Sequence, residues 1–315
     1  MNKITNNLKF RVNQLTLFLV CMVLYLAIIP TTFAYADETK LIETHNGTIN
    51  TRQIGENGPS VVFETGYGDA LISEENKDTW NGIQDATAKY AKTIAYDRFG
   101  LGKSSDIGNM PSLTKEQEQI IFDGGNIKYN QNDFNGQYKT GRDKAINLHD
   151  LLREAKIKKP YVLVVHSVGS FTAIEFAKMY KEDLAGIVML DGTFPALNKE
   201  LYTWEKDNMP DLAKNYADQF SDADGNVDEI LIGGLQCEKD LNSLKNIPIL
   251  YLQSSETLIS KEVDKLWEKG VINMISNSKF SKRVVVPNST HYVHRCNPEF
   301  VNNQIKTFID GINIK

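Results

Sequence analysis

The chain has 315 residues, of which 35 are Lys or Arg and 40 are Asp or Glu. Residues 1–36 hold three basic and no acidic residues, so residues 37–315 carry 32 basic against 40 acidic side chains. This acidic balance argues against nucleic acid and against anionic lipid headgroups as partners. No internal repeat, low-complexity tract or long linker interrupts residues 37–315, which we expect to form one domain with an inserted subdomain of unknown oligomeric state.

The N-terminus has the three parts of a secretory signal. Three basic residues precede the apolar run 15–29, and Ala34-Tyr35-Ala36 then places small residues at the positions that a signal peptidase reads. We therefore expect residues 1–36 to be a signal peptide, cleaved after Ala36, and the protein to be secreted or extracytoplasmic. The alternative is a membrane anchor at residues 15–30, but about 15 apolar residues fall short of the ~20 that a spanning helix needs.

Two cysteines follow the signal, Cys237 and Cys296. An even number in an oxidising compartment permits one disulfide but does not require one, so a bond and two free thiols both stay open. Neither cysteine has the C-x-x-C spacing of zinc or thioredoxin-like sites. We expect no metal and no cofactor.

Short β-rich runs recur along the chain. Residues 41–44 and 49–54 flank Asn46-Gly47 and are typical of an antiparallel hairpin. Six further runs are mostly unalternated, as strands buried on both faces should be: 60–64, 93–96, 161–165, 186–190, 249–252 and 284–286.

Helical patterns separate these runs. They cover residues 74–90, 140–156, 169–181, 259–270 and 297–311. This alternation predicts an α/β fold whose mostly parallel sheet is covered by helices on both faces. Polar, helix-prone sequence at about 194–246 is too long for a loop and predicts a small helical cap, here named the cap insertion.

The strongest local signal is the strand 161–165 running through His166-Ser167-Val168-Gly169 directly into a helix. A serine at so tight a strand-to-helix turn is forced into strained dihedral angles that expose its hydroxyl above the sheet. The usual pattern is G-x-S-x-G, and Val165 occupies the first glycine position here. Ser167 is the candidate nucleophile.

Two loops accompany this turn. Thr65-Gly66-Tyr67-Gly68 follows the strand 60–64, and Tyr96-Asp97-Arg98-Phe99-Gly100-Leu101-Gly102-Lys103-Ser104 follows the strand 93–96. With them the chain resembles the α/β-hydrolase superfamily, and within it the serine hydrolase and esterase branch with a Y-D-R-x-G-x-G-x-S loop. The resemblance runs from about residue 57 to residue 308 and is weakest in the cap insertion. In that family the Asp97–Arg98 step is mainly architectural.

The resemblance implies an oxyanion hole. In this architecture the two donors are the backbone N–H groups of Tyr67 and Val168, and the glycines beside Tyr67 let the backbone approach a substrate closely.

The resemblance also implies the general base. A histidine that follows the last strand and precedes an apolar residue is the base in this family, and His291 matches it. Histidine suits this role because its pKa lies near ambient pH. We interpret His294 as a wall of the site, and His45, His149 and His166 as structural, with His166 pointing away from the site.

The triad acid has two candidates. The family usually places it just after the strand 249–252, where Glu256 is the nearest carboxylate; Asp191, at the end of the strand 186–190, is the rival. Both fit the chain order of serine, acid and histidine, so order cannot separate them. We favour Glu256.

Together these residues predict an exported serine hydrolase that cleaves a small ester-like substrate through an acyl-enzyme on Ser167. Amide, lactone or peptide hydrolysis and a non-catalytic binding protein are the alternatives. In the cap insertion, Tyr202, Trp204 and Phe220 either line a substrate pocket or pack its core.

Overall fold

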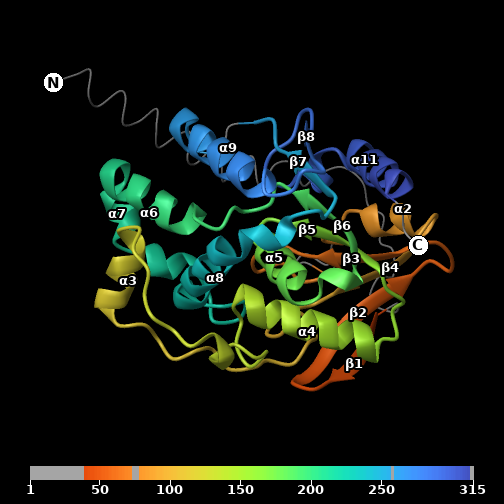
Figure 1. The fold of residues 1–315 in the computed structure, drawn as a ribbon, viewed down its shortest axis with the longest axis horizontal. Helices are drawn as coiled ribbons and strands as arrows, with labels where there is room; N and C mark the ends of the chain where they lie inside the picture. Colours follow the sequence, from red (N-terminus) through yellow and green to blue (C-terminus); the bar gives the residue numbers. More distant parts are fainter. Residues whose placement is uncertain (1–38, 73–77, 257–258, 313–315) are drawn as a thin grey trace. The chain divides into compact units, whose positions relative to one another are not determined.

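The computed structural model describes residues 39–72, 78–256 and 259–312. In this part of the chain eight strands form one sheet in the order β1-β2-β4-β3-β5-β6-β7-β8 (Figure 1). The first two pairs, β1 with β2 and β2 with β4, are antiparallel, and every later pair is parallel. The strands are β1 (Thr39–Thr44), β2 (Gly47–Ile54), β3 (Ser60–Glu64), β4 (Lys92–Tyr96), β5 (Tyr161–His166), β6 (Leu184–Leu190), β7 (Ile249–Gln253) and β8 (Ser281–Val285). This architecture confirms the predicted α/β class.

The central strands are buried on both faces. Every residue of β3 and β5 is buried, which explains their unalternated apolar sequences. Successive side chains of β5 enter opposite cores: Leu163 and Val165 face one apolar cluster, and Val162 and Val164 face the other. Val165 is fully buried, so the valine in place of the usual glycine is a packed core residue.

Helices cover both faces of the sheet (Figure 1). On one face α4 (Gly141–Glu154), α5 (Gly169–Met179) and α9 (Lys261–Ile275) pack against the strands, and on the other α2 (Ile83–Ala88) and α11 (Pro298–Gly311) do so. These helices match the predicted ones except at residues 74–90, where α2 is shorter. Part of that expected helix, residues 74–77, lies outside the described residues.

The cap insertion is helical, as its composition suggested. It contains α6 (Leu197–Asn208), α7 (Pro210–Ala213) and α8 (Val227–Asp240). A second segment joins it: α3 (Lys115–Phe122), which follows β4, shares an apolar cluster with α8. Tyr202 and Phe220 pack against this cluster, so they belong largely to its core. The sequence did not predict α3, because its residues are mostly polar.

The structure contains no Cys237–Cys296 disulfide. Both thiols are free: Cys237 is buried in α8 with its Sγ 3.6 Å from the carbonyl oxygen of Phe171, and Cys296 is exposed. The other alternative, two unpaired thiols, therefore describes this structure. Within the described residues, no helix is long and apolar enough to span a membrane. The predicted signal peptide, residues 1–36, lies outside them.

Candidate active site

Ser167 lies at a strained turn between β5 and α5. Its φ of 51° is in the left-handed region, which non-glycine residues rarely adopt. The turn is fixed on both sides: the N–H of Ser167 donates to Leu190 (3.2 Å), and its carbonyl accepts the N–H of Thr193 (2.9 Å). Ser167 stays partly exposed although β5 and most of α5 are buried. The local sequence therefore produces the predicted geometry, a serine raised at the carboxyl end of a buried strand.

His291 connects this serine to an acid. Its Nε2 lies 2.9 Å from Ser167 Oγ, and its Nδ1 lies 2.8 Å from Asp191 Oδ2. A carboxylate can only accept, so Nδ1 carries the ring proton and Nε2 is free to accept the hydroxyl proton of Ser167. The three side chains form one continuous hydrogen-bonded chain.

The preference for Glu256 as the acid was wrong. Its side chain is exposed, and the loop after β7 meets the histidine loop through main-chain bonds: the N–H groups of Ser255 and Glu256 both donate to Ser289 (3.0 Å each). Asp191 instead directly follows β6, the strand beside β5, and is fully buried. Neighbouring parallel strands deliver their carboxyl ends to the same edge of the sheet, which brings Asp191 to His291.

Hydrogen bonds from β7, the residue after it and α9 hold the loop that carries Asp191. Asp191 Oδ1 accepts the N–H of Ser254 (3.0 Å), so both carboxylate oxygens have partners. The hydroxyl of Tyr251 donates to the carbonyl of Gly192 (2.8 Å) and accepts the indole N–H of Trp267 (3.2 Å). Burial raises the pKa of Tyr251 well above its ordinary value, which keeps this hydroxyl a donor.

Gly66 brings the loop after β3 against the serine. A Cβ added to Gly66 would lie 3.3 Å from Ser167 Cβ and 2.5 Å from His166 Nδ1, so only glycine fits. Among the hydrogen bonds of the described residues, none uses the backbone N–H of Tyr67 or of Val168. Both candidate oxyanion donors thus lie on segments adjoining Ser167 without a protein partner.

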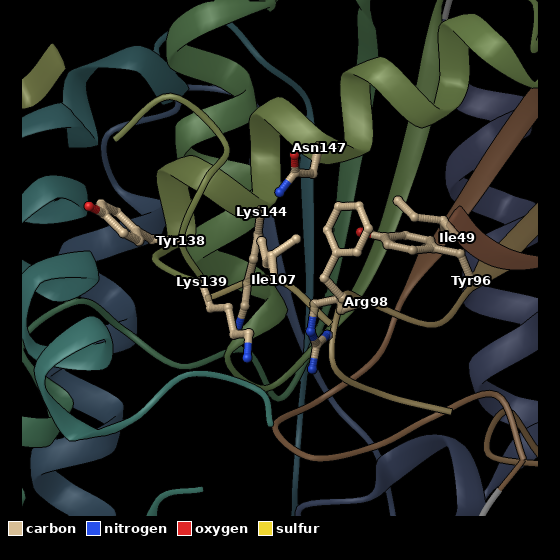
Figure 2. Close-up of a pocket in the computed structure, with 9 residues that line it drawn as sticks. Ile49, Tyr96, Arg98, Ile107, Tyr138, Lys139, Lys144 and Asn147 are labelled. Atoms are coloured by element: carbon tan, nitrogen blue, oxygen red, sulfur yellow. The ribbon is translucent and has the colours of Figure 1, made fainter. Parts of the chain in front are cut away.

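A buried charge network lies behind this loop. Arg98 donates to Asp224 through Nε (2.8 Å) and Nη2 (2.5 Å), and its Nη1 lies 3.2 Å from Glu64. Lys144 also pairs with Asp224 (3.0 Å). Burial alone would raise the pKa of Asp224, but the charges of Arg98 and Lys144 hold it well below its usual range. Figure 2 shows Arg98, Lys139 and Lys144 at a small pocket whose lining does not include Ser167 or His291.

The prediction that His166 points away from the site was wrong. Its ring lies 4.8 Å from the ring of His291, centroid to centroid, and its Nε2 donates to the backbone carbonyl of His291 (3.1 Å). The ring of His294 also lies 4.8 Å from that of His166, and His294 packs on Trp80. Burial lowers the pKa of both: well below the ordinary value for His166, and to about 3 for His294, where the charge of Arg295 adds to the effect. His294 is a buried packing residue.

Two residues of this region were missed from the sequence. Thr193 places its Oγ1 3.5 Å from Ser167 Oγ, and Asp224 reaches the loop after β3 from the cap insertion. No local pattern marks either of them. Across residues 39–72, 78–256 and 259–312, no group of three His, Cys, Asp or Glu side chains could hold a metal ion.

The buried histidines predict a pH-dependent stability. The unfolded pKa of histidine is about 6.5, and that of folded His294 is about 3. Between these values only the unfolded state binds the proton. The contribution of His294 to the free energy of unfolding is therefore fully present above pH ~6.5 and falls as the pH drops, by at most ~1.4 kcal/mol per pH unit. His294→Phe keeps the ring contact with Trp80 but cannot titrate. Urea unfolding at pH 7.5 and pH 5 should show a loss of stability about 1–2 kcal/mol smaller in His294→Phe than in the wild type; equal losses would contradict this.

Comparisons with known proteins agree with this fold. The Uncharacterized protein YqjL of Bacillus subtilis (strain 168) is 26% identical over 249 residues, which are 79% of this chain and 82% of that protein. A thermophilic esterase from Thermogutta terrifontis superposes with a TM-score of 0.53 at 17% identity, covering 86% of this chain and 98% of its own. The enol-lactonase from Burkholderia xenovorans LB400 gives 0.54 at 12% identity, covering 86% and 100%.

The family comparison covers most of the domain. A family model described as alpha/beta hydrolase fold matches residues 59–295, from the strand before the Gly66 loop to the helix after His291. That span includes the sheet from β3 onward and every residue of the hydrogen-bonded chain. The protein therefore belongs to the α/β-hydrolase family.

Proposed function

We propose that this protein is an exported serine hydrolase that cleaves small carboxylic esters through an acyl-enzyme on Ser167. The observation that carries the proposal is the hydrogen-bonded chain from Ser167 through His291 to Asp191, with distances of 2.9 and 2.8 Å. This is the arrangement that nucleophilic acyl transfer needs: a nucleophile, a base within hydrogen-bond reach and an acid that orients the base.

In the proposed acylation step, His291 Nε2 takes the proton of Ser167 Oγ as Oγ attacks the ester carbonyl. Asp191 accepts the hydrogen bond from the Nδ1–H group throughout, without taking its proton, and stabilises the imidazolium that forms. The carbonyl oxygen becomes an oxyanion, which the N–H groups of Tyr67 and Val168 bind. Collapse of the intermediate breaks the ester C–O bond, and His291 returns the proton to the leaving alkoxide.

Deacylation reverses these roles. Water enters where the alcohol left, and His291 takes one of its protons as the water oxygen attacks the acyl carbonyl. The second oxyanion occupies the same two donors, and its collapse releases the carboxylic acid and returns the proton to Ser167. The left-handed turn at Ser167 supports this cycle, because it holds the hydroxyl above the sheet throughout.

The proposal favours esters over amides, lactones and peptides as the substrate class, and it names no individual ester. The serine at the turn argues against the family members that use an aspartate nucleophile. A panel of p-nitrophenyl esters of increasing acyl length, tested on residues 37–315, would define the acyl preference. Turnover of amides or lactones but of no ester in the panel would contradict this part of the proposal.

The nucleophile is tested with a fluorophosphonate probe. The wild type should be labelled and Ser167→Ala should not, and ester turnover by Ser167→Ala should fall by at least ~1,000-fold, because only binding and the oxyanion donors remain. Labelling is read by in-gel fluorescence and turnover by release of p-nitrophenol. If neither protein is labelled or active, the chain is a non-catalytic binding protein and the proposal is wrong.

The acid is tested with a matched pair of amide variants. Asp191→Asn keeps the shape of the side chain but cannot hold His291 in the required tautomer, so kcat should fall by about 10⁴-fold, as in serine proteases. Glu256→Gln, on the exposed loop, is the control and should keep near-wild-type kcat. The reverse pattern would return the role to Glu256.

Export is the remaining part of the proposal and rests on the N-terminal sequence. A positively charged start, an apolar run and Ala34-Tyr35-Ala36 are the parts that a signal peptidase recognises. Protein recovered from the medium or the cell envelope of an expressing bacterium should begin at Asp37 by N-terminal sequencing. A membrane-bound product that retains residues 1–36 would support the anchor instead.

A further inference from the structure

The loop that carries the proposed oxyanion donor is held from outside the site. Arg98 donates through Nη2 to the carbonyl of Gly66 (2.6 Å) and through Nη1 to the carbonyl of Thr65 (2.7 Å). The next peptide is held by the cap insertion, because Asp224 Oδ2 accepts the N–H of Gly68 (2.8 Å). The two peptide groups that flank Tyr67 are therefore each bonded to one member of the Arg98–Asp224 ion pair.

The geometry of a peptide makes the first of these bonds decisive. The carbonyl of Gly66 and the N–H of Tyr67 belong to one planar trans peptide, so they point in opposite directions. Fixing the carbonyl toward Arg98 fixes the N–H toward the other side. A cation on the carbonyl also polarises the amide, which strengthens its N–H as a donor.

Asp224 is what keeps Arg98 in place. It is fully buried and binds Arg98 through both carboxylate oxygens, while Lys144 donates to its carboxylate (3.0 Å) and to its carbonyl (2.8 Å). These charges are buried. In the protein interior, the loss of one partner of an ion pair leaves the charge of the other uncompensated. Figure 2 shows Arg98 and Lys144 reaching toward the same region from different elements.

The cap insertion also contacts the side chain of Tyr67. The phenol oxygen lies 2.9 Å from the carbonyl of Gly225 and accepts the N–H of Ser221 (2.5 Å), and its ring meets that of Phe220 edge to face. Packing at Gly100 is equally close, since an added Cβ there would lie 2.0 Å from the carbonyl oxygen of Ala223. Residues 220–225 thus contact the loop after β3 and the loop after β4 at once.

We propose that Asp224 is a positioning residue: through Arg98 and Gly68 it sets the Gly66–Tyr67 peptide whose N–H binds the oxyanion. This inference rests on the proposed function. Asp224 touches neither Ser167 nor the substrate carbonyl, and it acts only by orienting the donor. Through Asp224 the cap insertion consequently helps to position the proposed oxyanion donor.

The test compares Asp224→Ala and Asp224→Asn with a control in the same fold. Glu175→Gln changes another fully buried carboxyl group, whose pKa burial raises to about 7; it lies 3.6 Å from Arg142 and makes no described bond to residues 64–68. All proteins are assayed with p-nitrophenyl acetate at a temperature where thermal unfolding shows them folded. We expect kcat to fall by about 10- to 100-fold in Asp224→Ala and less in Asp224→Asn, with KM within about threefold, because the oxyanion forms only in the transition state.

A transition-state analogue separates positioning from general damage. A trifluoromethyl ketone forms an oxyanion on the serine, so its inhibition constant should rise in Asp224→Ala by about the same factor as kcat/KM falls. Binding of the product carboxylate should stay unchanged, and Glu175→Gln should show neither effect. If Asp224→Ala does not fold, Asp224→Asn carries the same comparison.

Two outcomes distinguish this inference from the function on which it rests. An inactive wild type that the fluorophosphonate probe does not label overturns the proposed function and this inference with it. An active wild type together with an Asp224→Ala or Asp224→Asn variant of unchanged kcat overturns the positioning role alone. An equal loss in Glu175→Gln would also overturn it, because a change at any buried carboxyl group would then suffice.

Discussion

Two neighbouring strands that end in left-handed turns are the constraint on which the site depends. Ser167 has a φ of 51° after β5, and Asp191 has a φ of 44° after β6. Non-glycine residues pay of order 1–3 kcal/mol each for such backbone conformations. The burial of both strands and the bonds that join the two turns, from Ser167 to Leu190 and from Thr193 to Ser167, offset this strain. Ser167 and Asp191 are therefore positioned by the same two neighbouring strands of the sheet.

The two loops that complete the site are fixed by different kinds of interaction. The Asp191 turn is supported by neutral groups, since Tyr251 and Trp267 form a short hydrogen-bonded chain beneath Gly192. The loop after β3 is supported by the buried ion pair of Arg98 and Asp224. Burying charge is costly unless each group finds several partners, and here Arg98 has six acceptor atoms, four in Glu64, Thr65 and Gly66 and two in Asp224 of the cap insertion. A charged support holds a backbone loop that has no side-chain packing of its own at Gly66.

What could be predicted from the sequence was whatever is encoded locally. Strands buried on both faces read as apolar runs, and the turn at Ser167 follows from a strand that runs straight into a helix, so both were found. His291 was found from its place after the last strand. Asp191 and Glu256 obeyed the same chain order, and the sheet order, which places β6 beside β5, separates them. The Asp191-Gly192 pair, typical of a tight turn, was the one local signal in favour of Asp191.

The rest could not be predicted because it joins distant segments. Arg98 and Asp224 are 126 residues apart, and no local sequence pattern around either residue predicts their contact. The packing of α3 on α8 is of the same kind, since a mostly polar helix acquires its buried side only when a partner is present. The place of His166 beside Ser167 led to the wrong prediction that its ring points away from the site. The turn instead directs the ring into the space that Gly66 leaves by having no side chain. A close backbone approach at one loop thus decides the direction of a side chain on another, which is information that only the folded chain contains.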